Sequence, residues 1–136
     1  MKKITICSKF DLFPDNTMLG SSFGYSNFNF ISKSGISIMV NETAGEKGIT
    51  IRPIGTSVTF PTSVNYVAFR VGIWDGNSIN VIAKNENGQI ITQRSINGIN
   101  QYIDSSITGE NIQFVDFDTN GNEELLVSIC IDIIAP

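Results

Sequence analysis

The segment Asp116–Leu126, with the sequence DFDTNGNEELL, places acidic and amide side chains at alternate positions. Oxygen ligands spaced in this way are typical of calcium loops. An EF-hand loop that begins at Asp116 requires a bidentate glutamate at its twelfth position, and that position is Val127. The flanking residues have the alternating pattern of strands rather than the period of helices. We therefore reject an EF-hand.

Two interpretations of this segment remain. The first is a calcium loop of another type, flanked by strands, with Asp116, Asp118 and Asn120 as ligands. The second is a solvated hairpin turn at Asp118–Gly121, because Asn-Gly adopts the positive φ angles that a tight turn requires. In that case Asp116 faces solvent from its strand. We favour the turn.

A second candidate site surrounds the single tryptophan, in Gly72–Asn77 with the sequence GIWDGN. An indole ring can stack on the face of a pyranose while neighbouring acid and amide groups bind its hydroxyls. This interpretation assigns Trp74, Asp75 and Asn77 to a sugar-binding loop, and Tyr102 joins them if its loop is adjacent. The alternative is that Trp74 packs into one end of the hydrophobic core.

The residues that are missing exclude several kinds of chemistry. The chain has no histidine, so Ser-His-Asp triads, Cys-His pairs and His-ligated zinc are excluded. Acidic residues are present, but they cluster around expected turns, and no phosphate-binding glycine loop or nucleophile elbow is found. The sequence therefore predicts that the protein is not an enzyme.

The net charge is −4 and only 16% of residues are charged. Nucleic-acid binders carry a basic face, and none is visible, so we expect no nucleic-acid partner. No apolar run approaches the roughly 20 residues that span a bilayer, so we expect no membrane insertion. No signal peptide is recognised, which predicts a cytoplasmic protein, or a secreted or surface protein if a signal has been removed.

Cys7 lies in the first expected strand and Cys130 in the last. Terminal strands are neighbours in many β-sandwiches, so a disulfide is one of two alternatives. Because no export signal is recognised, we favour two buried thiols.

Strand signals dominate the chain, and no stretch has a helical period over 12 residues. Short alternating segments are separated by glycine and asparagine turns such as Gly45 and Asn85–Gly88, which is the pattern of a sandwich or barrel. We expect ten strands: Lys3–Cys7, Phe28–Ser32, Ile36–Val40, Ile49–Arg52, Ser57–Phe60, Asn65–Gly72, Ile79–Lys84, Gln89–Ser95, Asn111–Phe117 and Leu125–Ile134.

Several segments together carry a resemblance to a known family. They are Phe10–Thr17, Phe23–Phe30, Val58–Phe69, Ile79–Ile91 and Ile131–Ile133. This set resembles the β-sandwich domains of bacterial surface proteins of the PEP-CTERM-associated type, which are similar in fold to jelly-roll carbohydrate-binding modules. The resemblance implies a binding or structural module at the bacterial surface, without an activity.

Jelly-roll binding modules often hold a structural calcium where the first and last strands meet. The matching positions in this chain are Asp11 and Asp132. A carboxylate in the apolar run around Asp132 needs a partner if it is buried. The alternative is that Asp132 faces solvent on an alternating strand.

The sequence thus predicts one all-β domain over residues 1–136, an antiparallel jelly-roll sandwich. We expect a non-catalytic, lectin-like module that binds a glycan, with a structural Ca²⁺ as its only cofactor. The alternative is a structural or assembly subunit that binds another protein surface and forms a homo-oligomer through its sheet faces or edges.

Overall fold

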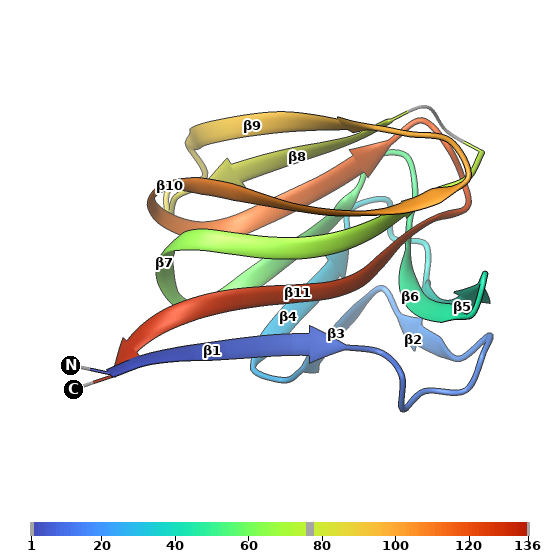
Figure 1. The fold of residues 1–136 in the computed structure, drawn as a ribbon, viewed down its shortest axis with the longest axis horizontal. Coiled ribbons are helices and arrows are strands. Elements are labelled where there is room, and N and C mark those ends of the chain that lie inside the picture. Colours follow the sequence, from blue (N-terminus) through green and yellow to red (C-terminus); the bar gives the residue numbers. More distant parts are fainter. Residues whose placement is uncertain (1, 76–77, 136) are drawn as a thin grey trace.

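The computed structural model describes residues 2–75 and 78–135. These residues form eleven strands, all paired antiparallel, and no helix (Figure 1). The strands are β1 Lys2–Lys9, β2 Met18–Gly20, β3 Ser22–Tyr25, β4 Phe28–Ser32, β5 Ile38–Thr43, β6 Glu46–Ile51, β7 Thr56–Ile73, β8 Ser78–Lys84, β9 Ile90–Asn97, β10 Gln101–Thr119 and β11 Glu124–Ala135. No helix in this part of the chain is long and apolar enough to cross a membrane.

The long strands β7 and β10 take part in both layers of the sandwich. In one layer, β11 lies between β1 and the second half of β7, which pairs with the first half of β10. This layer is nearest the viewer in Figure 1. In the other layer, the first half of β7 lies between β4 and the second half of β10, which also pairs with β8. The predicted fold class, an antiparallel jelly-roll sandwich, is confirmed.

Pro61 marks the point where β7 passes from one layer to the other. Thr59 is opposite Phe114 and Val64 is opposite Ile112, so β7 has four residues between these pairs where β10 has one. Proline has no backbone N–H for a ladder and is tolerated at such irregularities. The prediction of two separate strands here was therefore wrong: the segment is one strand with a bend.

The prediction missed three other segments. Strands β2 and β3 have only three and four residues, which is too short for alternation to be recognised. The first half of β10, Gln101–Glu110, has only two aliphatic residues, Ile103 and Ile107, among mostly polar ones. Its apolar period is therefore weak. By contrast, Phe28–Ser32 coincides with β4, and Gly45 adopts a φ of 84° in the turn between β5 and β6, as expected for a hairpin glycine.

The core lies between the two layers and is rich in phenylalanine. Phe69 and Phe117 come from opposite layers and contact each other edge to face, with ring centroids 5.3 Å apart. Phe28, Phe30 and Phe10 form a second aromatic group and are almost fully buried. Complete burial of one such side chain stabilises a fold by about 1.5–3 kcal/mol. Residues of this core, such as Ile73 at the end of β7, anchor the strands next to the candidate site.

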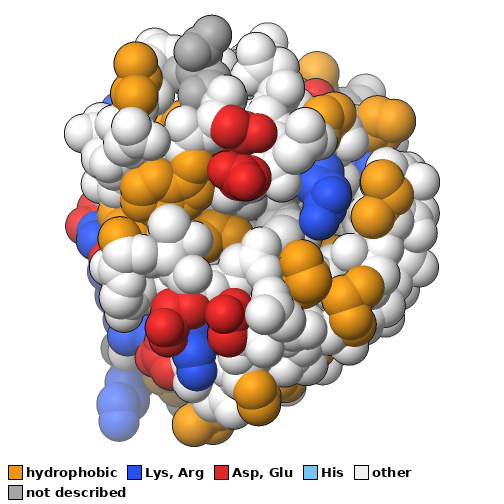
Figure 2. Space-filling model, turned by 90° about the vertical axis from the view of Figure 1, so that its right-hand side faces the viewer, with side chains coloured by type: hydrophobic (Ala, Val, Ile, Leu, Met, Phe, Trp, Pro, Cys, Tyr) orange, Lys and Arg blue, Asp and Glu red, His pale blue; other side chains and the backbone are white. Residues whose placement is uncertain are grey.

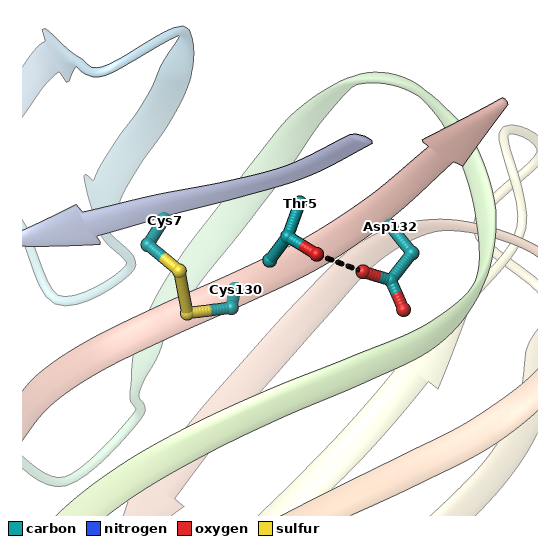
Figure 3. The surroundings of a disulfide bond; sticks show 4 residues. All are labelled: Thr5, Cys7, Cys130 and Asp132. Carbon is teal, nitrogen blue, oxygen red and sulfur yellow. Dashed lines mark hydrogen bonds between the residues drawn. A yellow bond between two sulfur atoms is a disulfide. The ribbon is translucent and has the colours of Figure 1, made fainter. Parts of the chain in front are cut away.

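Cys7 and Cys130 form a disulfide between β1 and β11 (Figure 3). The two residues are directly opposite each other in the strand register, with Cα atoms 4.1 Å apart. The favoured prediction of two buried thiols was wrong, since Cys7 is exposed and bonded. The physical reason is the register: antiparallel pairing of the terminal strands brings the two sulfur atoms together on one face.

The segment Asp118–Gly121 does not form a hairpin turn. Strands β10 and β11 pair with opposite edges of β7 and not with each other. Their connection passes from one layer to the other and is bound to Asp75, just beyond the end of β7. The predicted hairpin was wrong, because the Asn-Gly signal marks a tight connection but does not specify which strands it joins.

Candidate functional site

A pocket of about 400 Å³ opens at the end of the sandwich where β7 ends. Figure 2 shows this end of the molecule, with acidic side chains in two groups, the lower of which also contains a Lys or Arg side chain, and hydrophobic side chains exposed between the groups. The pocket collects residues from the β1–β2 loop, β5, the end of β7, and the β9–β10 and β10–β11 loops. Its lining residues are Asp15, Asn16, Asn41, Glu42, Thr43, Trp74, Asn100 and Glu123.

Among the described lining residues, Trp74 is the only aromatic one. The side chain is half-buried and lies outside the buried core. The indole meets the Tyr102 ring edge to face, with centroids 5.0 Å apart and planes at 86°. Its Nε1 is buried and has no nitrogen or oxygen partner. The indole is thus fixed along one edge and reaches the pocket without filling the core.

Gly72 makes room for the two aromatic rings. A Cβ atom at this position would lie 2.8 Å from Cε1 of Tyr102 and 3.0 Å from Nε1 of Trp74. Both distances are below ordinary van der Waals contact. Gly72 is opposite Tyr102 in the ladder, so the phenol ring lies directly over the glycine. The absence of a side chain at Gly72 therefore sets how closely the ring pair approaches the sheet.

Tyr102 on β10 forms a hydrogen bond with Thr43, a residue of the pocket lining. Its hydroxyl donates to the carbonyl of Thr43 at 2.5 Å. Burial, and then the negative charge of Glu46, raises the pKa of Tyr102 to about 12. The phenol therefore stays a hydrogen-bond donor at any physiological pH. The Arg70 guanidinium lies 5.1 Å from the ring centroid and binds the Glu46 carboxylate through two N–H groups at 2.8 and 2.7 Å.

The loop that carries Trp74 is bound by the buried carboxylate of Glu124. Glu124 Oε1 accepts hydrogen bonds from the backbone N–H groups of Trp74 and Asp75, at 3.0 and 3.1 Å. Thr119 Oγ1 donates to the other carboxylate oxygen at 3.2 Å. These bonds fix the backbone on both sides of the Trp74 carbonyl.

Asp75 makes the reciprocal contact. Its carboxylate accepts the backbone N–H groups of Asn122 and Glu123, each at 3.0 Å. Burial acts to raise the pKa of Asp75, but hydrogen bonds to its carboxylate, above all these two from backbone N–H groups, outweigh it, so the pKa is lowered. The ionised carboxylate thus holds the β10–β11 loop against the end of β7, which places Glu123 in the pocket lining.

The structure divides the sugar-binding residues predicted from the sequence into different roles. Trp74 lines the pocket. Asp75 and Tyr102 lie beside it and position the loops around it. Asn77 lies outside the described residues. None of these placements tests ligand binding, so the assignments stay predictions.

Seven of the eight lining residues were not identified from the sequence, since they come from four separate segments. One local signal was available for two of them. Asn16 and Asn100 adopt positive φ angles of 66° and 52°, and asparagine in a loop is the residue type that does so most readily after glycine. This signal identifies a tight loop, but it does not show that two such loops meet at one pocket.

The residues predicted as calcium ligands in the DFDTNGNEELL segment lie in different environments. Asp116 is only 4% exposed and is bound by Lys84 Nζ at 2.7 Å and Lys33 Nζ at 3.2 Å. The expected solvent-facing side chain was therefore wrong. The Asp118 carboxylate accepts a hydrogen bond from the backbone N–H of the next residue, Thr119. Asn120 is exposed in the loop. A carboxylate already paired with two ammonium groups does not fit a calcium ligand.

Asp11 and Asp132 are also separated. Asp132 is opposite Thr5 in the register and accepts its hydroxyl at 2.7 Å (Figure 3). Lys3 Nζ lies 3.2 Å from the same carboxylate. Asp11 is exposed in the loop beyond the far end of β1. Among the residues that the structure describes, no group of three acidic or cysteine side chains is arranged to hold a metal.

Comparison with known proteins identifies the fold. No protein-family model matches the chain, and no curated protein matches it. A family 29 carbohydrate-binding module variant matches with a TM-score of 0.50 and 11% identity, over 96% of this chain and 91% of the other. These values establish a shared fold.

Two larger enzymes contain a similar domain. An arabinose-bound GH51 α-L-arabinofuranosidase matches with a TM-score of 0.54 and 11% identity, over 94% of this chain and 26% of the enzyme. A family two carbohydrate esterase from Cellvibrio japonicus matches with a TM-score of 0.50 and 16% identity, over 99% of this chain and 36% of the esterase. The chain spans about a quarter to a third of these two enzymes.

Proposed function

We propose that the protein is a non-catalytic carbohydrate-binding module and that glycans bind in the Trp74 pocket. The observation that carries this proposal is the half-buried indole in a pocket whose other lining side chains are amides, carboxylates and one hydroxyl. A sugar ring has an apolar face and a polar rim, and this lining offers a partner for each. The pocket size also lies within the range of small-ligand sites.

The rigidity of the pocket supports the proposal. Trp74 is held through its backbone by Glu124 and through its ring by Tyr102. A side chain that is already ordered loses little conformational entropy when a ligand stacks on it. The protein therefore offers a preformed surface, which suits weakly interacting ligands such as sugars.

The similar solved structures are compatible with this role. One is named as a carbohydrate-binding module and is matched over nearly its whole length. The other two are named as enzymes, an α-L-arabinofuranosidase and a carbohydrate esterase, and only part of each is matched. We propose no catalytic role for this chain.

The cellular setting follows from two further features. The resemblance to bacterial surface domains implies a surface location, and we propose it here. The Cys7–Cys130 bond supports this proposal, because disulfides persist in oxidising compartments and are rare in the cytosol.

The proposal is tested by measuring binding to a glycan array and then titrating the best ligand by calorimetry. Trp74→Ala should abolish binding while leaving the melting temperature within a few degrees, because the ring lies outside the core. Tyr66→Ala is the matched control: Tyr66 is an aromatic residue on β7 with 41% exposure, and it does not line this pocket. Unchanged glycan binding by the Trp74 variant would refute the site.

The structural calcium is tested on the same sample. A cation that binds the native state raises the melting temperature through mass action. Melting in EDTA should then give a lower temperature than melting in excess calcium. Equal melting temperatures would remove calcium from the account and leave the glycan proposal intact.

The alternative role, self-assembly, is favoured by one observation. Strand β9 pairs only with β8, and β1 pairs only with β11, so each presents one unpaired edge. Free edges allow sheets of two copies to join. Light scattering after size-exclusion chromatography should show a defined oligomer if assembly is the function. A monomer that binds glycans supports the binding module.

A further inference from the structure

The Trp74 pocket is acidic. Three of the eight lining residues that the structure describes, Asp15, Glu42 and Glu123, are carboxylic acids, and none of the eight is a lysine or arginine. All three are exposed. The carboxylates come from three segments that are distant in the sequence, and Asp15 and Glu42 are neighbours in the fold.

The nearest cationic side chains along these strands are engaged elsewhere. Arg70 binds the carboxylates of Glu46 and Asp104, both at 2.7–2.8 Å. Lys47, which is opposite Glu42 in the β5–β6 register, directs its Nζ to the carbonyl of Asp11 at 3.4 Å. Neither residue lines the pocket. Arg70 is neutralised by its two carboxylates, whereas Lys47 contacts a neutral carbonyl and keeps its charge beside Glu42. The described lining itself holds three carboxylates and no cation.

Two hydrogen bonds hold the segments that carry the three acids. Asp15 Oδ1 accepts the backbone N–H of Glu42 at 2.8 Å, which joins the β1–β2 loop to β5. The backbone N–H of Glu123 is bound by Asp75 at 3.0 Å. The chain thus keeps three like charges around one opening, although their mutual repulsion is unfavourable. A ligand with a positive charge relieves this repulsion.

We propose that the Trp74 pocket selects glycans that carry a protonated amino group, such as 2-amino-2-deoxyhexoses, over their neutral and carboxylated counterparts. This inference rests on the proposed glycan-binding function and adds the ligand class. The indole stacks on the ring face that amino and neutral sugars share. The ammonium group then supplies the interaction that neutral sugars lack, and uronic acids are repelled.

The size of the preference follows from the exposure of the acids. Ion pairs at exposed sites contribute about two- to fivefold in affinity for each carboxylate that the ammonium group meets. The preference should weaken as ionic strength rises, because salt screens exposed charges over about 10 Å at 0.1 M. Stacking on Trp74 should be insensitive to salt.

The test uses matched sets of immobilised sugars in the gluco, galacto and manno series. Each set contains the hexose, the 2-amino-2-deoxyhexose, its N-acetylated form and the uronic acid. In whichever series binds, the amino sugar should bind most tightly, and its advantage should fall at 0.5 M salt. Binding of the hexose, the N-acetylated sugar or the uronic acid with equal or greater affinity would overturn the inference.

Charge-neutral variants test the cause of the preference. In Glu42→Gln/Glu123→Gln the backbone bonds to Asp15 and Asp75 are retained. The ratio of amino-sugar to hexose affinity should fall by about four- to twentyfold, whatever the absolute affinity for the hexose. The matched control is Glu86→Gln in the β8–β9 turn, which does not line this pocket and should leave the ratio unchanged. An unchanged ratio in the double variant would overturn the inference.

The outcomes separate this inference from the function on which it rests. If neutral glycans bind at Trp74 without a preference for amines, the glycan-binding function stands and the charge selection fails. If no sugar in any series binds to the wild-type protein, the proposed function itself fails.

Discussion

The Asp75 and Glu124 carboxylates each bind backbone N–H groups in the segment that carries the other residue. Glu124 accepts the N–H groups of Trp74 and Asp75, while Asp75 accepts those of Asn122 and Glu123. The two carboxylates thus join the end of β7 to the β10–β11 loop, two segments about fifty residues apart in the chain. The position of the indole and the shape of the pocket depend on this pair.

Glu124→Ala should lower the free energy of unfolding by about 2–4 kcal/mol, because it leaves a cavity and two backbone N–H groups without their acceptor. Glu124→Gln keeps an oxygen in the same place and should cost about 1 kcal/mol. Urea denaturation measures both values. Equal losses in the two variants would show that the negative charge, rather than the accepting oxygen, matters.

Asp75→Ala should weaken glycan binding by about five- to twentyfold, since it removes charge-assisted bonds that place the Glu123 segment. The same bonds stabilise the fold, so the melting temperature should also fall. Asp75→Asn retains one accepting oxygen and should lose less affinity. Calorimetric titration decides the matter, and wild-type affinity in Asp75→Ala would show that the pocket does not need this contact.

Removal of the disulfide should destabilise the fold strongly. Cys7 and Cys130 are 123 residues apart, so their bond restricts most of the unfolded chain. A loop of this length predicts a loss of about 3–5 kcal/mol in Cys7→Ala/Cys130→Ala. Denaturation of the wild type with and without reductant provides the same comparison. Two reactive thiols in the unreduced, denatured protein would contradict the bond.

Asp116 should make stability depend on pH. Burial acts to raise its pKa, but hydrogen bonds from Lys84 and Ser57 and the charge of Lys33 outweigh it, so the pKa is lowered from its ordinary value. A lowered pKa in the fold stabilises the protein above the unfolded value of about 3.9, and this contribution is lost as the pH falls through the folded value.

Asp116→Asn should therefore cost about 1–3 kcal/mol at pH 7, and this cost should shrink below pH 4. Urea denaturation across this range measures it. Asp118→Asn, two positions along β10, serves as the control and should show a small effect. A cost for Asp116→Asn that is equal at pH 7 and pH 3 would contradict the ion-pair account.

The fold class could be predicted because alternation and turn residues are local. Strand β4 was predicted residue for residue, since Phe28 and Phe30 alternate with Asn29 and Ile31. Pairing is not local, and the errors arise there. The partner of Cys7 depends on the register of β1 on β11. Asp116 is buried beside Lys33, which pairs with its carboxylate from a position 83 residues away in the sequence.

The site was recognisable only in its aromatic residue. Trp74 stands out because it is the single tryptophan beside a turn. Asp15, Glu42 and Glu123 come from loops and a strand that meet only in the folded chain, and no spacing in the sequence relates them. The charge of the pocket, on which the proposed ligand selection depends, therefore could not be predicted.

The most direct test of the central claim uses the intrinsic fluorescence of Trp74, since the chain has no other tryptophan. The indole is half-buried in the free protein, so a sugar stacked on it removes water from the ring. Titration with the best ligand from the glycan array should give a saturable shift of the emission to shorter wavelength, with the same dissociation constant as calorimetry. Calorimetric binding without any change in the emission would place the ligand elsewhere and contradict the account.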